Sequence, residues 1–210
     1  MINYLANPKR FLKFSKVIQP LLGYSSLILI TIGLYFSLLD SPVDYQQGHT
    51  VRIMYVHVPS AWLASILYFA MAGCAAIFLI WKHPLADISS RCIAPIGLIF
   101  SLLTLITGSL WGKPMWGTWW VWDARLTSEL VLLFIYLSII FLYHAYDDYR
   151  KGAKAANILA IVGFINIPII HFSVEWWNTL HQGPSVMKFS SPSISDEMLY
   201  PLIYTTIGFT

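Results

Sequence analysis

Residues 61–80 read AWLASILYFAMAGCAAIFLI, a stretch of twenty residues without a charged side chain. A helix needs roughly 20 apolar residues to cross about 30 Å of hydrocarbon. Because backbone polar groups inside lipid must be satisfied within their own segment, this stretch predicts a transmembrane helix and not a strand. The whole chain of 210 residues is 57% hydrophobic and only 11% charged, because it contains further runs of the same kind.

Six apolar runs divide the chain, and we interpret each of them as a helix. The sixth run has 12 residues, about 18 Å of helix, which is too short to cross a bilayer. We expect this run to be truncated, and the alternative is a half-span. The predicted architecture is an all-α polytopic membrane helical bundle in a single domain, 1–210, with a tail at 1–18, six transmembrane helices at about 19–40, 60–81, 92–111, 127–146, 157–173 and 199–210, an outer tryptophan-rich segment at 111–128 and an outer loop at 174–198.

Basic residues are unevenly distributed between the two sides of the predicted bundle. Nine lie on the side of the N-terminus: Lys9, Arg10, Lys13, Lys16, Lys82, Arg91, Arg150, Lys151 and Lys154. Four lie on the other side: Arg52, Lys113, Arg125 and Lys188. Cytoplasmic loops carry the excess of basic residues, so we expect the N-terminus inside and the tryptophan-rich segment outside. The net charge of +3 follows from this topology and implies no nucleic-acid partner.

Ionisable side chains are missing from the predicted spans, apart from the helix ends. Pumps and ion-coupled transporters keep such groups near the middle of the membrane. The pattern therefore argues against a proton relay or a polar pore, and we expect the function to reside at one end of the bundle.

Tryptophans concentrate at the outer end, above all in residues 116–123, which read WGTWWVWD. An aromatic belt at the membrane interface is the ordinary explanation, but a belt needs no such density and would form on both sides. The cluster favours instead a platform for a large, flat, hydrophobic ligand. On a helix, Trp116, Trp119, Trp120 and Asp123 would share one face at i, i+3, i+4 and i+7.

His57 and His181 lie in different predicted outer loops beside this platform. A single histidine near a helix end is usually a structural residue, whereas two imidazoles on opposite sides of a porphyrin bind a haem iron axially. Zinc is the competing metal, because His49, His57, His171 and His181 offer four nitrogens. Zinc does not explain the tryptophans, so we favour haem, with His171 as a substitute ligand.

Arg125 lies four residues before Glu129, so one interpretation is a local ion pair. The other is that Arg125 binds an anionic group such as a haem propionate, for which a forked guanidinium is the preferred donor. Arg52 and Lys113 are the next candidates for the propionates. An ionised Asp123 cannot bind a propionate, and we expect it to accept from a backbone or indole N–H, or to hold Arg125.

The tryptophan segment and its flanks resemble a known family. Residues 116–128, WGTWWVWDARLTS, are similar to the tryptophan-rich "WWD" signature of haem-handling proteins. Together with residues 44–48 (DYQQG), 55–59 (YVHVP), 108–115, 129–134 and 168–183, they resemble the cytochrome c maturation protein C family, the haem exporters C, over nearly the whole chain.

This resemblance implies an outward-facing site for haem b in a bacterial inner-membrane protein, without catalytic residues. His57 and His181 are the implied axial ligands of the iron. The residues expected to contact haem are Trp111, Trp116, Trp119, Trp120, Trp122, Asp123, Arg125, Trp176 and Trp177. The implied receiver of haem is a membrane-anchored periplasmic haem chaperone, and the implied complex contains an ABC ATPase subunit, a second membrane subunit and a small single-helix subunit.

The resemblance thus implies a subunit that delivers haem, and not an enzyme. Two other hypotheses stay open at this point. One is a membrane haem lyase that attaches haem to apocytochrome c, although related lyases are larger and carry additional histidines. The other is a structural transporter subunit without a ligand.

Overall fold

The computed structural model describes residues 7–181, 183, 186 and 193–210. This part of the chain consists of helices and their connections and contains no β-strand. Two compact units make it up, residues 1–42 with 195–210 and residues 43–194. The predicted polytopic helical architecture is confirmed, since five helical stretches of the described chain are long and apolar enough to cross a membrane: Lys9–Asp40, His49–Trp81, Pro84–Trp116, Ala124–His144 and Tyr149–Trp176.

The first unit consists of α2 (Pro8–Tyr35), the π-helical turn η1 (Phe36–Asp40) and α8 (Asp196–Phe209). Small residues bring α2 and α8 close together, as is common for helix pairs in lipid: a Cβ atom at Gly33 would lie 2.7 Å from Cγ2 of Thr205. Asn7 caps α2 by accepting from the backbone N–H of Lys9 at 3.0 Å. Residues 8–18, predicted as part of a tail, therefore belong to α2.

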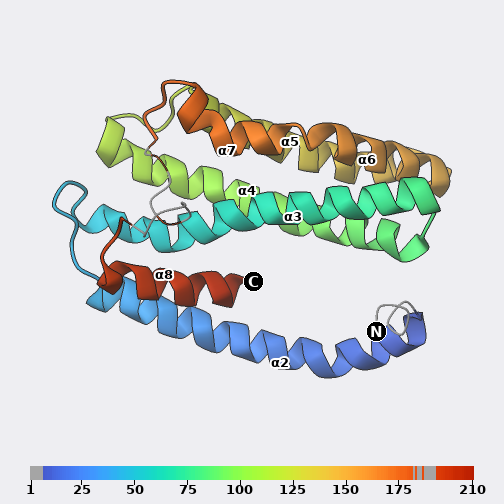
Figure 1. Ribbon diagram of the computed structural model, residues 1–210, viewed down its shortest axis with the longest axis horizontal. Coiled ribbons are helices and arrows are strands. Elements are labelled where there is room, and N and C mark those ends of the chain that lie inside the picture. Colours follow the sequence, from blue (N-terminus) through green and yellow to red (C-terminus); the bar gives the residue numbers. More distant parts are fainter. Residues whose placement is uncertain (1–6, 182, 184–185, 187–192) are drawn as a thin grey trace. The chain divides into compact units, whose positions relative to one another are not determined.

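The second unit consists of the 3-10 turn η2 (His49–Ile53), α3 (Met54–Trp81), α4 (Pro84–Trp116), α5 (Ala124–His144), α6 (Tyr149–Gly163) and α7 (Asn166–Trp176). Helix α3 packs against α4 and α6, while α5 packs against α4, α6 and α7 (Figure 1). The connections at 43–48, 117–123 and 177–181 gather at one end of this unit, which we call the pocket end (Figure 1).

Two tyrosines fill the core of the second unit, midway along its helices. Tyr68 and Tyr136 are fully buried, and their rings meet edge to face with centroids 5.2 Å apart. Their hydroxyls donate to the carbonyl oxygens of Ala160 at 3.0 Å and Ala64 at 2.8 Å. Gly97 makes room for this pair, since a Cβ atom there would lie 2.2 Å from Cζ of Tyr136. The tyrosines therefore connect α3, α4, α5 and α6.

A buried carboxylate joins the helices at the end opposite the pocket end. Asp87, in the first turn of α4, is 2% exposed. It accepts hydrogen bonds from Tyr143 of α5 at 2.9 Å, from Asn157 of α6 at 2.7 Å and from the hydroxyl of Tyr149. A buried carboxylate is costly unless it is hydrogen-bonded, so these donors make its position in the bundle tolerable.

The span predicted at 157–173 consists of two helices, α6 and α7. Pro168 has no backbone N–H to donate to the carbonyl of Phe164, four residues earlier. That carbonyl accepts from Ile167 instead, at 3.0 Å, and the α-helical pattern is interrupted there. Helices α3 and α4 extend beyond their predicted bounds, and this extension carries α3 into the pocket end.

Candidate functional site

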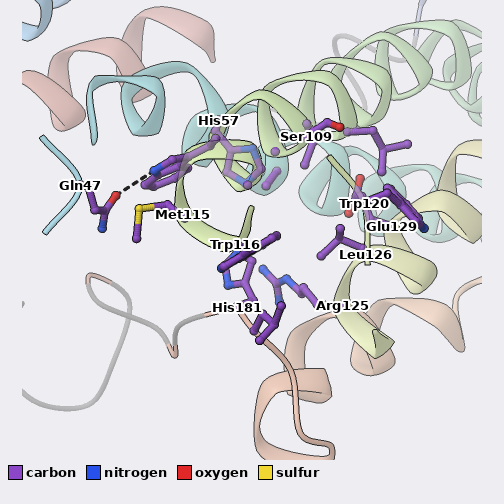
Figure 2. A pocket seen from close by; sticks show the side chains of 17 residues that line it. Gln47, His57, Ser109, Met115, Trp116, Trp120, Arg125, Leu126, Glu129 and His181 are labelled. Atoms are coloured by element: carbon purple, nitrogen blue, oxygen red, sulfur yellow. Dashed lines mark hydrogen bonds between the residues drawn. The ribbon is translucent and has the colours of Figure 1, made fainter. Parts of the chain in front are cut away.

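A pocket opens at the pocket end of the second unit, among α3, α4, the first turns of α5 and the segment that follows α7 (Figure 2). Its empty volume, counted with the open mouth and the solvent in it, is about 880 Å³. The described lining residues are Gln47, His57, Ala61, Thr104, Leu105, Gly108, Ser109, Trp111, Gly112, Met115, Trp116, Trp120, Arg125, Leu126, Glu129, Leu180 and His181.

His57 lies in the first turn of α3, and not in a loop before that helix as the sequence predicted. The side chain is 9% exposed, and its Nδ1 lies 3.0 Å from the hydroxyl oxygen of Thr107 on α4. Gly108 allows this approach, because a Cβ atom there would lie 3.1 Å from Cε1 of His57. The ring also meets Trp111 edge to face, with centroids 5.7 Å apart. Helix α4 therefore holds this imidazole in place.

His181 reaches the same pocket from a segment far along the chain. It follows α7, outside any helix, and its side chain is half-buried. The centroids of the His57 and His181 rings are 6.5 Å apart, and the ring planes are inclined by 33°. The structure thus brings together the two imidazoles that the sequence singled out (Figure 2).

The middle of the tryptophan-rich segment, residues 117–123, is not helical. Gly117 has a φ of 75° and ends α4 in the left-handed conformation that glycine adopts readily. Residues 117–123 form an irregular connection, and α5 begins only at Ala124. The common helical face considered for Trp116, Trp119, Trp120 and Asp123 therefore does not form.

The tryptophans of this region divide into two groups as a result. Trp111, Trp116 and Trp120 line the pocket. Trp119 and Trp122 are 53% and 75% exposed and are not among the described lining residues. The pocket therefore has an indole wall, while two further indoles face outward beside it.

Asp123 and the tryptophans of α7 also lie outside the described lining. Oδ1 of Asp123 accepts from the backbone N–H of Leu126 at 2.8 Å and caps α5, which is one of the roles expected for it. Trp176 and Trp177 lie at the end of α7, each about half exposed. The ring of Trp176 stacks on Phe172, with centroids 5.2 Å apart.

Arg125 is a cation in the pocket wall (Figure 2). Its Nη1 donates to the carbonyl oxygen of Ile170 on α7 at 2.5 Å. Glu129, which is 6% exposed, accepts from the hydroxyl of Ser101 at 2.9 Å and lies within electrostatic reach of Arg125. Arg125 thus borders the pocket with Glu129 within electrostatic reach, and both interpretations of Arg125 stay predictions.

The other predicted cations and histidines lie elsewhere. Lys113 donates to the carbonyl oxygen of Gly117 at 3.0 Å, and neither it nor Arg52, His49 or His171 is among the described lining residues. Within the described ranges, no group of three or more His, Cys, Asp or Glu side chains is arranged to hold a metal ion. Zinc, which needs three or four protein ligands, is therefore not supported there.

Sequence reasoning missed several lining residues. Gln47 accepts from the indole Nε1–H of Trp111 at 2.8 Å, and it is presented by a turn in which Oδ1 of Asp44 accepts from its backbone N–H at 2.8 Å. Thr104, which lines the pocket, and Thr107, which contacts His57, lie on the α4 face that carries Trp111. Helical spacing alone would have placed these threonines beside the tryptophan, whereas the contact with Gln47 depends on how distant segments pack.

The fold and the pocket together define a class. This class is a polytopic helical membrane protein with a pocket at one end that is lined by tryptophans and by two histidines. The whole chain, residues 1–210, matches the sequence model of the family described as CcmC, Heme exporter protein C, and the chain belongs to this family.

Relatives show the same relationship along nearly the full chain. Heme exporter protein C of Bradyrhizobium diazoefficiens is 52% identical over 206 residues, which are 98% of this chain and 78% of the relative. Heme exporter protein C of Escherichia coli K12 is 48% identical over 208 residues, 99% of this chain and 84% of the relative. A putative cytochrome c biosynthesis ccmC-like mitochondrial protein of Arabidopsis thaliana is 48% identical over 191 residues, 91% of this chain and 72% of the relative.

Proposed function

We propose that this protein binds haem b between His57 and His181 at the periplasmic face of the bacterial inner membrane and delivers it to a membrane-anchored haem chaperone for the biogenesis of c-type cytochromes. Its family and the names of its relatives support haem handling and cytochrome c biosynthesis as the process. The protein acts as a delivery subunit and not as an enzyme.

The distance between the two imidazoles carries this proposal. An imidazole nitrogen lies about 2 Å from a metal that it binds. Two such bonds in line, together with the distance from each bound nitrogen to the centroid of its own ring, give a separation of roughly 6 Å between the two ring centroids. The centroids of His57 and His181 are 6.5 Å apart. This separation supports a single iron between them, with the macrocycle in the gap.

The apolar wall suits the faces of a porphyrin. Trp111, Trp116 and Trp120 contribute indoles, and Met115 and Leu126 contribute aliphatic surface. Burying apolar area stabilises a complex by about 25 cal/mol per Å², so about 200 Å² of covered porphyrin contributes about 5 kcal/mol. The iron bonds therefore need not supply all of the affinity.

Two donors support the binding of the haem propionates. Arg125 presents a guanidinium at the pocket wall, held by the carbonyl of Ile170, and a guanidinium binds carboxylates in a forked geometry. The indole Nε1–H of Trp120 is buried and has no hydrogen-bond partner in the part of the chain that the structure describes. A buried donor left in this state is unfavourable, and an anionic ligand in the pocket would satisfy it.

The membrane topology follows from the basic residues. The excess of Lys and Arg on the side of the N-terminus supports a cytoplasmic N-terminus and a periplasmic pocket end. Trp119 and Trp122 are exposed beside the pocket, which supports a periplasmic surface for the chaperone. An ABC ATPase subunit, a second membrane subunit and a small single-helix subunit are the proposed companions in the complex.

The experiment is an absorption and electron paramagnetic resonance comparison of the purified protein with His57→Ala, His181→Ala and the double variant in lipid nanodiscs. We expect the unmodified protein to carry haem with a low-spin signature and both single variants to lose that signature. His144→Ala is the matched control, because His144 ends α5 at the opposite end of the second unit. Wild-type spectra from both single variants would overturn the assignment of ligands.

Delivery is tested separately, by co-expressing the chaperone and measuring covalent haem on it. We expect the chaperone to be loaded by the unmodified protein and to remain empty with either histidine variant. Haem found instead on an apocytochrome c, with no chaperone present, would contradict the proposed role and identify a lyase.

A further inference from the structure

The hydroxyl of Thr107 lies against the imidazole of His57 and has no role in the proposed function so far. Its Oγ1 is 3.0 Å from Nδ1 of His57, and both side chains are buried. The contact joins α3 to α4 at the pocket, between residues that are 50 positions apart in the chain.

The direction of this hydrogen bond follows from a count of protons. A threonine hydroxyl has one proton to donate and lone pairs to accept with. Oγ1 of Thr107 lies 2.7 Å from the carbonyl oxygen of Leu103 and 3.3 Å from that of Thr104. Because carbonyl oxygens only accept, these two short distances favour donation of the Thr107 proton to the backbone of its own helix. The hydroxyl oxygen then presents a lone pair to His57, and this arrangement favours Nδ1 as the donor.

A neutral imidazole that carries its proton on Nδ1 has its lone pair on Nε2. Histidines that bind metals almost always donate their other ring N–H to a protein acceptor, and this bond fixes both the tautomer and the ring orientation. Turning the ring of His57 by half a revolution would replace Nδ1 by a carbon atom at Thr107 and lose the hydrogen bond. The close approach of Gly108 and Trp111 to the ring further restricts its rotation.

We propose that Thr107 is the positioning residue for His57: it fixes the imidazole in the tautomer with the proton on Nδ1 and thereby prepares Nε2 to bind the haem iron. This inference rests on the proposed function, because it takes His57 to be an iron ligand. The hydrogen bonds of Thr107 are the observations that carry it. Thr107 itself does not contact the iron.

The test compares Thr107→Val, which keeps the branched shape without a hydroxyl, with Thr107→Ser, which keeps the hydroxyl. Thr206→Val is the matched control, because Thr206 lies on α8, outside the described pocket lining, and its hydroxyl likewise donates to a carbonyl of its own helix, that of Leu202, at 2.7 Å. The haem-loaded proteins are compared by the rate of haem transfer to apomyoglobin and by their low-spin signal. Loss of such a supporting hydrogen bond typically weakens a metal site by about 10–100-fold.

We expect Thr107→Val to release haem at least about tenfold faster and to show a weaker low-spin signal, while Thr107→Ser and Thr206→Val behave like the unmodified protein. Equal release rates and equal spectra for the two valine variants would overturn the inference. If the unmodified protein lacks a spectrum that depends on His57, the proposed function fails instead, and this outcome is recognised without any threonine variant.

A second measurement needs neither haem nor a variant at Thr107. The nitrogen-15 spectrum of the haem-free protein labelled on histidine, with His57→Ala to assign the signals, reports which ring nitrogen of His57 carries the proton at neutral pH. We expect the proton on Nδ1. A proton on Nε2 would overturn the inference even if Thr107→Val does not fold.

Discussion

The indole of Trp111 donates to the side-chain oxygen of Gln47 at 2.8 Å. Because an indole N–H only donates, this bond turns the amide oxygen of Gln47 toward Trp111 and its NH₂ group away. The contact joins the turn at 44–48 to α4 and fixes one edge of the pocket. Trp111 in turn meets the ring of His57, so a residue of the first connection supports the orientation of a proposed iron ligand.

Gln47→Leu removes the acceptor and leaves the indole N–H of Trp111 without this partner. We expect the variant to bind haem several-fold more weakly, because a buried donor without a partner costs about 1–3 kcal/mol. Gln47→Glu keeps an acceptor at the same position and should bind more tightly than Gln47→Leu. Titration of the haem-free proteins with haem, followed by the Soret band, measures both affinities. Equal affinities for the two variants would show that the hydrogen bond has no part in binding.

Arg125→Lys keeps the charge in the pocket wall but removes the planar fork. We expect haem to dissociate roughly tenfold faster, because a lysine cannot reproduce a bidentate bond to a carboxylate. Lys113→Gln is the control, since Lys113 bonds the carbonyl of Gly117 outside the described pocket lining. Stopped-flow transfer of haem to apomyoglobin gives the rates. A faster release of haem from Lys113→Gln than from Arg125→Lys would show that Lys113, and not Arg125, binds the propionates.

Asp123→Asn removes a charge but retains a side chain that caps helices well. We expect the variant to keep its thermal stability, its haem and the transfer of haem to the chaperone, because Asp123 caps α5 through Leu126. Asp123→Ala removes the cap and should lose about 1 kcal/mol of stability, measured by thermal unfolding in detergent. If transfer is lost in Asp123→Asn while haem binding persists, the charge has a role in delivery.

Gly97→Ala tests the core below the pocket. The added methyl group would lie 2.2 Å from Cζ of Tyr136, and such overpacking typically costs about 1–3 kcal/mol. Gly73→Ala, in α3, is the matched control, because nothing lies within 4 Å of the position that its Cβ would occupy. We expect a lower midpoint of thermal unfolding for the first variant only. A similar loss in both variants would point to a general effect of alanine in these helices.

The helices were predictable because their cause is local. Twenty apolar residues such as 61–80 can do little else in a membrane than form a spanning helix. The interruption of the helix near Phe164 was also predictable from the sequence, since it follows from Pro168 alone. The predicted span at 157–173 lies within the stretch Tyr149–Trp176, which is long and apolar enough to cross a membrane, but its interruption was not foreseen, because the length of the run was weighed and the proline was not.

The pocket was predictable only in part. The histidines and the indoles were recognisable from their residue types and their density, yet the common face considered for Trp116, Trp119, Trp120 and Asp123 assumed a helix. Gly117 ends that helix with a φ of 75°, and glycine also occurs inside helices, so its presence did not reveal this. Which indoles turn inward depends on packing between segments that are distant in the sequence, as does the partner of Gln47.

The two facing imidazoles are anchored unequally. His57 lies in the first turn of α3, whereas His181 lies at the end of the described residues 177–181, which follow α7 and are outside any helix. In the proposed haem site, His181 can therefore move away from the iron without the displacement of any helix. This unequal placement of the two proposed ligands suits a site that releases its haem, as proposed, better than a site that retains it.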